Sequence, residues 1–220
     1  ENKYEALKAK QDNGKALQGS LISIDITTGE VIAMVGGRNF KDSQFNRVTE
    51  SFRQVGSVMK PFTYMAALES ETPEAQPYHP LTPLEDQRFE HSYDGQTWSP
   101  RNYDRRYRGT VPLFYALKES LNVATANLGL QVGLKKVIDV AKRFGVESEI
   151  KPLPSLILGA FELRPWEVAQ SYLTMARFGN RIPLSMVRRI EDLNGQILYR
   201  KVTDSVRAAE ADDTAVLVGM

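Results

Sequence analysis

A hydroxyl and an amine lie three residues apart at the start of an apolar helical pattern, in the stretch Val55-Gly56-Ser57-Val58-Met59-Lys60-Pro61-Phe62. Residues three apart share one face of a helix. Pro61 falls in the first turn, where its missing N–H costs least because that group would have no intrahelical partner. The stretch therefore predicts a helix that begins near Ser57 and carries Ser57 and Lys60 on one face.

This pair is a candidate for acyl transfer without histidine. A serine hydroxyl becomes an effective nucleophile when a neighbouring group takes its proton, and a lysine amine can do so if burial or a nearby cation lowers its pKa. A simpler interpretation stays open, because serine is also a good helix N-cap. The Ser-x-x-Lys pattern recurs at 148–151, where flanking glutamates and a following proline indicate a solvated loop.

The composition is that of an ordinary globular protein, with 220 residues, 42% hydrophobic and 25% charged, enough for one substantial core. A formal net charge of +1 gives no sign of nucleic-acid binding. The absence of cysteine excludes disulfides, thiol nucleophiles and zinc-thiolate sites. The only histidines, His79 and His91, lie in a proline-rich region, so neither a metal enzyme nor a Ser-His-Asp triad is favoured. We expect no cofactor and no metal.

The chain begins with a polar segment that resembles the end of an incoming helix, followed by a hairpin. Ile22, Ile24 and Ile26 alternate with polar residues, the turn falls at 27–29, and a second run at 31–35 is apolar on both faces. That pattern predicts a second strand covered by helices. A second hairpin is predicted at 186–199, around Asp192-Leu193-Asn194-Gly195.

Helical patterns occupy most of the remaining chain, at 111–132, 134–144, 165–178 and 208–220. Residues 70–110 lack clear periodicity, and a structureless run of this length is usually functional or disordered. The segment Trp98-Ser99-Pro100-Arg101-Asn102-Tyr103-Asp104 favours an ordered loop, which either lines a cleft or is pinned by packing of Trp98 and Tyr103.

The helical pattern at 111–132 is interrupted by Ser120-Leu121-Asn122, the only Ser-x-Asn in the chain. Residues two apart point in different directions on a continuous helix, so Ser120 and Asn122 can face one site only at a break between helices. The alternative is that one of them caps the second helix.

These two motifs, in this order and about sixty residues apart, resemble those of the penicillin-binding protein transpeptidases. The likeness covers roughly residues 18–220. It extends to the 98–104 segment, to Leu158-Gly159-Ala160 and to Glu167-Val168-Ala169-Gln170, which look most like the bifunctional class A enzymes of bacterial wall synthesis.

The resemblance implies a peptidoglycan D,D-transpeptidase. Ser57 would attack the penultimate D-alanine carbonyl of a stem peptide, expel the terminal D-alanine, and pass the acyl group to an amine of a neighbouring stem. Lys60 would be the general base, Ser120 would relay a proton, and Asn122 would orient Lys60 and bind the substrate amide. β-Lactams would acylate Ser57, and further wall-synthesis proteins are expected partners.

The resemblance also implies an α+β fold, an antiparallel sheet flanked by helices as in the serine β-lactamases. We expect residues 1–19 to be an interdomain tether and 20–220 a transpeptidase domain lacking its C-terminal strands, because the family's third motif, Lys-Thr-Gly or Lys-Ser-Gly, does not occur. A membrane anchor is expected outside this chain, which would place the domain on the periplasmic side of the bacterial cytoplasmic membrane.

Three other functions share these motifs. A serine β-lactamase needs the deacylating glutamate of a Glu-x-x-x-Asn pattern, which is not found here. A D,D-carboxypeptidase would pass the acyl group to water, and only the class A likeness argues against it. A non-catalytic β-lactam sensor or wall-binding scaffold would be acylated without turnover, and the missing third motif leaves that alternative open.

Overall fold

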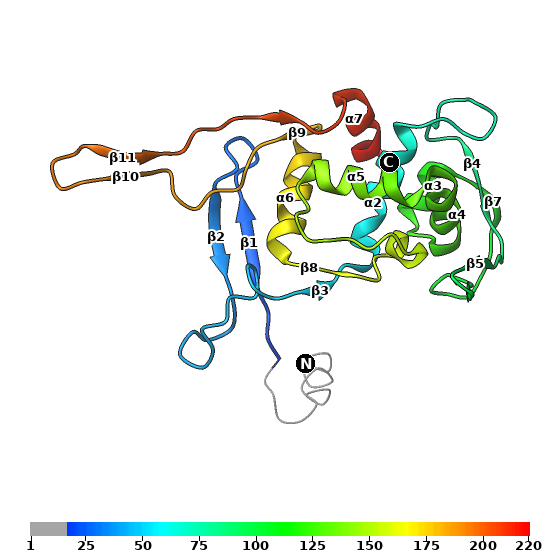
Figure 1. Cartoon of the computed structure of the whole chain (residues 1–220), viewed down its shortest axis with the longest axis horizontal. Coiled ribbons are helices and arrows are strands. Elements are labelled where there is room, and N and C mark those ends of the chain that lie inside the picture. The colour runs from blue at the N-terminus through cyan, green and yellow to red at the C-terminus, as the bar shows by residue number, and fades with distance from the viewer. Residues whose placement is uncertain (1–16) are drawn as a thin grey trace.

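The computed structural model describes residues 17–220, and residues 1–16, which hold most of the expected tether, lie outside them. The described chain is mixed helix and strand, with a helical body and strands at its edges (Figure 1). The helices are η2 (Gly56–Met59), α2 (Lys60–Leu68), α3 (Leu113–Lys118), α4 (Asn122–Val132), α5 (Leu134–Phe144), η3 (Pro154–Leu158), α6 (Pro165–Ala176) and α7 (Ala211–Gly219).

Helix α2 lies at the centre of the core and packs against α4, α5 and α7. Seven of its nine residues are buried, so water reaches almost none of its surface. Phe62 on α2 meets Phe144 at the end of α5 edge to face, with ring centroids 6.2 Å apart. Fully burying an aromatic side chain of this kind stabilises a fold by about 1.5–3 kcal/mol. A central position for α2 means that its first turn is held rigidly from several sides.

Every sheet in residues 17–220 has two antiparallel strands, paired β1–β2, β3–β8, β4–β7, β5–β6, β9–β12 and β10–β11. The strands are β1 (Leu21–Ile24), β2 (Val31–Val35), β3 (Arg53–Gln54), β4 (Pro83–Asp86), β5 (His91–Tyr93), β6 (Gln96–Trp98), β7 (Gly109–Pro112), β8 (Glu162–Leu163), β9 (Asn180–Arg181), β10 (Arg189–Glu191), β11 (Ile197–Arg200) and β12 (Val206–Arg207).

Most predicted elements are confirmed. The first hairpin forms as β1–β2 and the second as β10–β11. Helix α5 ends at Gly145, which adopts the left-handed conformation (φ +118°) that favours glycine after a helix. Helix α6 begins at Pro165, where the Arg164 backbone N–H donates to the Glu167 carboxylate and the Glu167 backbone N–H donates to Arg164 O. Local spacing was sufficient to locate these boundaries.

Two expectations are wrong. The second strand was expected to be covered by helices, but within residues 17–220 Ile32 and Val35 of β2 are 68% and 52% exposed, and α6 packs on β1 instead. Residues 70–110 are not structureless, since β4–β7 and β5–β6 lie there. All four strands are too short to show an apolar period, and β4 pairs with a strand more than twenty residues later in the chain.

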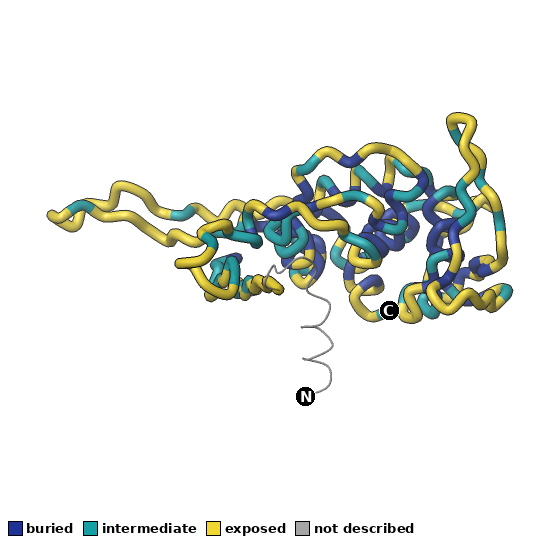
Figure 2. The backbone as a smooth tube through the Cα atoms, turned by 90° about the horizontal axis from the view of Figure 1, so that it is seen from below, coloured by how far each residue is buried: buried dark blue, intermediate teal, exposed yellow. Residues whose placement is uncertain are grey.

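Burial divides the molecule clearly between its helical body and its projecting segments. Figure 2 shows buried residues concentrated in the helical body, while the β10–β11 hairpin extends away from it as an exposed ribbon. Within residues 17–220, none of the helices combines the length and the apolar character required to cross a bilayer.

Candidate active site

Ser57 lies in the 3₁₀ turn η2, immediately before α2, and its side chain is exposed. The residue at the N-cap of this turn is Val55, and no side chain caps it. The N-cap interpretation of Ser57 is therefore wrong. The Ser57 carbonyl accepts the Lys60 backbone N–H, so the turn leads directly into α2 and places the serine one turn before the lysine.

The chain that leads into Ser57 is held by a segment a hundred residues later. Strand β3 pairs with β8, the Val55 N–H donates to Phe161 O at 3.0 Å, and the Gly56 N–H donates to Gly159 O at 3.0 Å. Gly159 has φ +70°, and a Cβ atom there would overlap the Gly56 backbone. Only glycine therefore permits this close approach.

Lys60 is buried, with 1% of its surface exposed, at the start of α2. Its Nζ donates to Ser120 O at 2.5 Å, to Ser120 Oγ at 2.9 Å and to Asn122 Oδ1 at 2.7 Å. Burial lowers the pKa of the Lys60 amine to about 8, because removing an ammonium from water disfavours the charged form. A neutral amine is therefore accessible close to neutral pH.

Ser120 and Asn122 lie at the break that their spacing predicted, between α3 and α4. Ser120 adopts φ +53°, a left-handed conformation uncommon for a serine, and this turn allows both side chains to face Lys60. Neither is the N-cap of α4, because that residue is Leu121 and no cap bond comes from its side chain. The capping interpretation of the motif is thus wrong.

The amide of Asn122 is oriented by a backbone group that sequence reasoning missed. Its Nδ2 donates to Arg101 O at 2.9 Å, which leaves Oδ1 directed at Lys60. The reverse orientation would place two carbonyl oxygens together and an NH₂ group against the lysine. A main-chain carbonyl carries no residue-specific signal, so only the fold could reveal this contact.

The structure thus joins Lys60, Ser120 and Asn122 by direct hydrogen bonds and places Ser57 beside them along η2 and α2. Among residues 17–220 no hydrogen bond links Ser57 Oγ to Lys60 Nζ, so proton transfer between them would require the two groups to move closer together. Catalytic hydrogen bonds are often long before substrate binds.

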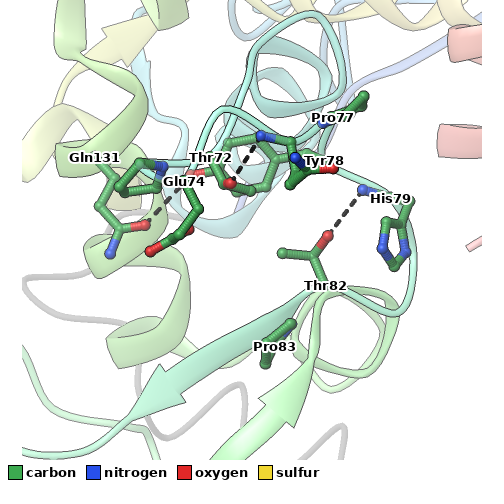
Figure 3. Close-up of a pocket in the computed structure, with 10 residues that line it drawn as sticks. Thr72, Glu74, Pro77, Tyr78, His79, Thr82, Pro83 and Gln131 are labelled. Carbon is green, nitrogen blue, oxygen red and sulfur yellow. Dashed lines mark hydrogen bonds between the residues drawn. The ribbon is translucent and has the colours of Figure 1, made fainter.

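Other features of the described chain lie apart from this cluster. Within residues 17–220, no three His, Asp or Glu side chains are grouped as metal ligands. A pocket of about 440 Å³ opens between Thr72, Tyr78, Thr82 and Gln131 (Figure 3). None of Ser57, Lys60, Ser120 and Asn122 lines it, so it is separate from the candidate site.

The 98–104 segment is an ordered loop, but only one of its two aromatic side chains packs against the rest of the protein. Trp98 packs edge to face on Phe89, with centroids 6.3 Å apart, whereas the Tyr103 side chain is fully exposed. The loop is anchored by Asn102, whose side chain is buried.

Comparison with known proteins places the fold and this site in a family. Residues 19–216 match the model of the penicillin-binding protein transpeptidase domain. The chain therefore belongs to the penicillin-binding protein transpeptidase family. This assignment confirms the resemblance and the fold class inferred from the sequence.

The similar proteins are class A penicillin-binding proteins. The chain is 44% identical over 193 residues to penicillin-binding protein 1B of Vibrio cholerae, covering 86% of this chain and 24% of that protein. It is 40% identical over 212 residues to penicillin-binding protein 1B of Escherichia coli, covering 94% of this chain and 24% of that protein. The chain thus spans about a quarter of the length of these relatives.

Solved structures agree with the family. The crystal structure of penicillin-binding protein 1A from Haemophilus influenzae matches with a TM-score of 0.77 and 30% identity, over 86% of this chain and 28% of that one. The PonA1 protein of Mycobacterium tuberculosis, in complex with penicillin V, matches with a TM-score of 0.76 and 24% identity, over 96% of this chain and 57% of that one. The second likeness shows the fold alone.

Proposed function

We propose that this chain forms the transpeptidase domain, over residues 20–220, of a peptidoglycan D,D-transpeptidase that is acylated by β-lactams. One observation carries the proposal. A buried lysine amine, with a pKa lowered by burial, is hydrogen-bonded to Ser120 and Asn122 and lies one turn from an exposed serine hydroxyl. This set of groups suits a serine nucleophile activated by an amine.

In the first step, Ser57 Oγ attacks the carbonyl carbon of the penultimate D-alanine while neutral Lys60 takes the hydroxyl proton. The tetrahedral intermediate collapses, the amide C–N bond breaks, and the terminal D-alanine leaves with a proton. In the second step an amine of another stem peptide attacks the ester, and Ser57 regains its proton. The Ser57 backbone N–H, at the start of the helix, is one donor for the oxyanion.

Ser120 is suited to relay the proton because a hydroxyl both accepts and donates. The Lys60 ammonium has three donors and meets three acceptors, namely Ser120 O, Ser120 Oγ and Asn122 Oδ1. After loss of a proton, the amine has a lone pair, and the Ser120 hydroxyl can rotate and donate to it. The same hydroxyl can then pass a proton towards the leaving amine.

Asn122 is assigned to hold Lys60 and to bind the substrate amide. Its Oδ1 accepts a hydrogen bond from Lys60, and its Nδ2 donates one to Arg101 O. The substrate amide would therefore share or replace one of these two bonds. The stem peptide and β-lactams are the expected ligands, and wall-synthesis proteins are expected partners. We assign the domain to the periplasmic side of the cytoplasmic membrane, with an anchor elsewhere in the protein.

The test is intact-mass spectrometry of the complete gene product after incubation with a penicillin. We expect one adduct of a single drug mass in the wild type and none in Ser57→Ala. Ser148→Ala is the matched control, because Ser148 belongs to the second Ser-x-x-Lys pattern and its hydroxyl donates to Glu167 instead. A folded wild type without adduct, or an adduct retained in Ser57→Ala, would exclude the proposal.

A further inference from the structure

We infer that Asn102 and Asp86 are positioning residues for acyl transfer, acting through Asn122 and Lys60. This inference rests on the proposed function, because it concerns the same site. Asn102 and Asp86 are both buried and lie outside the two motifs that carry the chemistry. They form a polar network at the start of α4.

The Asn102 side chain uses both ends of its amide. Its Oδ1 accepts the backbone N–H groups of Asn122 at 2.8 Å and Val123 at 3.1 Å, the first two residues of α4. These groups have no partner within the helix. Asn102 thus caps α4 from twenty residues earlier in the chain, in place of the residue at its own N-cap position.

Asp86 determines which way the Asn102 amide faces. Asn102 Nδ2 lies 2.8 Å and 3.0 Å from the two Asp86 carboxylate oxygens, and it also donates to Arg106 O at 2.8 Å. Rotating the amide by half a turn would put its oxygen against a buried carboxylate and its NH₂ against two backbone N–H groups. The carboxylate is held in turn by the Arg108 backbone N–H at 2.9 Å.

This network reaches the amine through two contacts of Asn122. The Asn102 cap fixes the backbone of Asn122, and the neighbouring carbonyl of Arg101 fixes its side chain. Asn122 Oδ1 can then meet Lys60 Nζ at 2.7 Å. A catalytic group displaced by about 1 Å can lose about a hundredfold in rate. Loosening Asn102 should therefore be measured as slower acylation at Ser57.

The test exchanges the two groups of the pair. In Asn102→Asp two buried carboxylates face each other. In Asp86→Asn the NH₂ group of the new amide faces another donor in either orientation, namely the Asn102 NH₂ group in one and the Arg108 backbone N–H in the other. The double variant Asp86→Asn/Asn102→Asp restores a donor opposite an acceptor and keeps an acceptor at the start of α4. It leaves one poor contact, between the new carboxylate and Arg106 O.

The measurement is the second-order rate constant of acylation by a fluorescent penicillin, for the folded fraction of each complete gene product. We expect each single variant to lose about ten- to a hundredfold, and the double variant to recover to within roughly tenfold of wild type. Because the double variant preserves the network, it carries the test even if a single variant folds poorly. A double variant slower than both single variants would overturn the inference.

Gln170→Ala is the control for general loss of stability. Gln170 is another buried amide that bonds two backbone groups, Ile182 O and the Leu184 N–H, both at 2.9 Å and away from Lys60. The variant is compared with Asn102→Ala. We expect both variants to lower the Tm, but Gln170→Ala should keep the acylation rate within about twofold of wild type, whereas Asn102→Ala should slow it more. An equal loss of rate in Gln170→Ala and Asn102→Ala would overturn this inference and leave the proposed function standing. A wild type that is never acylated would overturn the proposed function and this inference with it.

Discussion

Lys60 Nζ lies 2.7 Å from Asn122 Oδ1, although the two residues are 62 positions apart in the chain. The contact joins the first residue of α2 to the first residue of α4, two helices that pack together in the core. The buried amine is therefore located by helix packing and its hydrogen bonds are directed by the turn at Ser120.

Acylation of Ser57 should depend on pH through Lys60. Burial lowers the pKa of Lys60 from 10.5 to about 8, so the neutral amine that can accept a proton becomes more abundant as pH rises. The neutral fraction is about one in a hundred at pH 6 and one in ten at pH 7, and it levels off above about pH 9. The acylation rate constant, measured with a penicillin from pH 6 to 9.5, should follow this curve.

Lys60→Arg is the control for that profile, because a guanidinium stays charged throughout this range. It should be acylated at most very slowly at every pH. A wild-type rate that is flat from pH 6 to 9 would contradict the assignment of Lys60 as the base.

Gly159→Ala should destabilise the fold and slow acylation together. Gly159 has φ +70°, and its new Cβ would overlap the Gly56 backbone, which must then move away from its place before Ser57. We expect the free energy of unfolding to fall by about 2–4 kcal/mol and the acylation rate by at least about tenfold. Thermal or urea unfolding and penicillin acylation measure the two effects.

Gly95→Ala separates backbone strain from the overlap. Gly95 has φ +71° but has open space where a Cβ would lie. This variant should lose about 1–2 kcal/mol and keep the wild-type acylation rate. If Gly159→Ala behaves like Gly95→Ala, the contact with Gly56 does not position Ser57.

Glu167→Gln should destabilise the protein at neutral pH but much less in acid. Burial by itself raises the pKa of the Glu167 carboxyl, but hydrogen bonds from Ser148 and Arg164 outweigh it and lower the pKa to about 2. A carboxyl with a lowered pKa in the folded state contributes stability above its ordinary value, 4.5, and loses it as pH falls towards about 2. This contribution is on the order of 3 kcal/mol.

The measurement is urea unfolding of wild type and Glu167→Gln from pH 7 to 2. The difference in free energy of unfolding should be constant above about pH 5 and shrink below it. Glu147→Gln is the control, because Glu147 is exposed and lies 3.8 Å from the same Arg164. It should change stability by less than about 1 kcal/mol. A difference for Glu167→Gln that does not vary with pH would contradict the argument.

Elements with a repeated local pattern could be predicted from the sequence. The alternation of Ile22 and Ile24, the glycine at 145 and the proline at 165 depend on strand and helix periods and on backbone preferences, which neighbouring residues determine. The break at Ser120-Leu121-Asn122 was predictable for the same reason. Strand β4 was not, because four residues are too few to reveal a period and its partner β7 is more than twenty residues away.

The candidate site was predictable in part. The spacing of Ser57 and Lys60 placed both on one helix turn, and the family resemblance indicated Ser120 and Asn122 as their partners. Their catalytic roles stay predictions. Asn102 was noted only as part of an ordered loop, because an asparagine in a loop is common and nothing nearby in the chain indicates that it caps a helix.

Local chemistry along the chain was thus sufficient for helix boundaries, hairpins, the exclusion of thiol chemistry and the placing of Ser57 one turn before Lys60, since all of these depend on residue type and short spacing. Only the tertiary structure decided that Lys60 is buried with a lowered pKa and that Gly159 contacts Gly56. It alone also decided that Asn102, held by Asp86, and the Arg101 carbonyl bond Asn122. The physical reason is that desolvation and long-range hydrogen bonds depend on which distant segments are packed together.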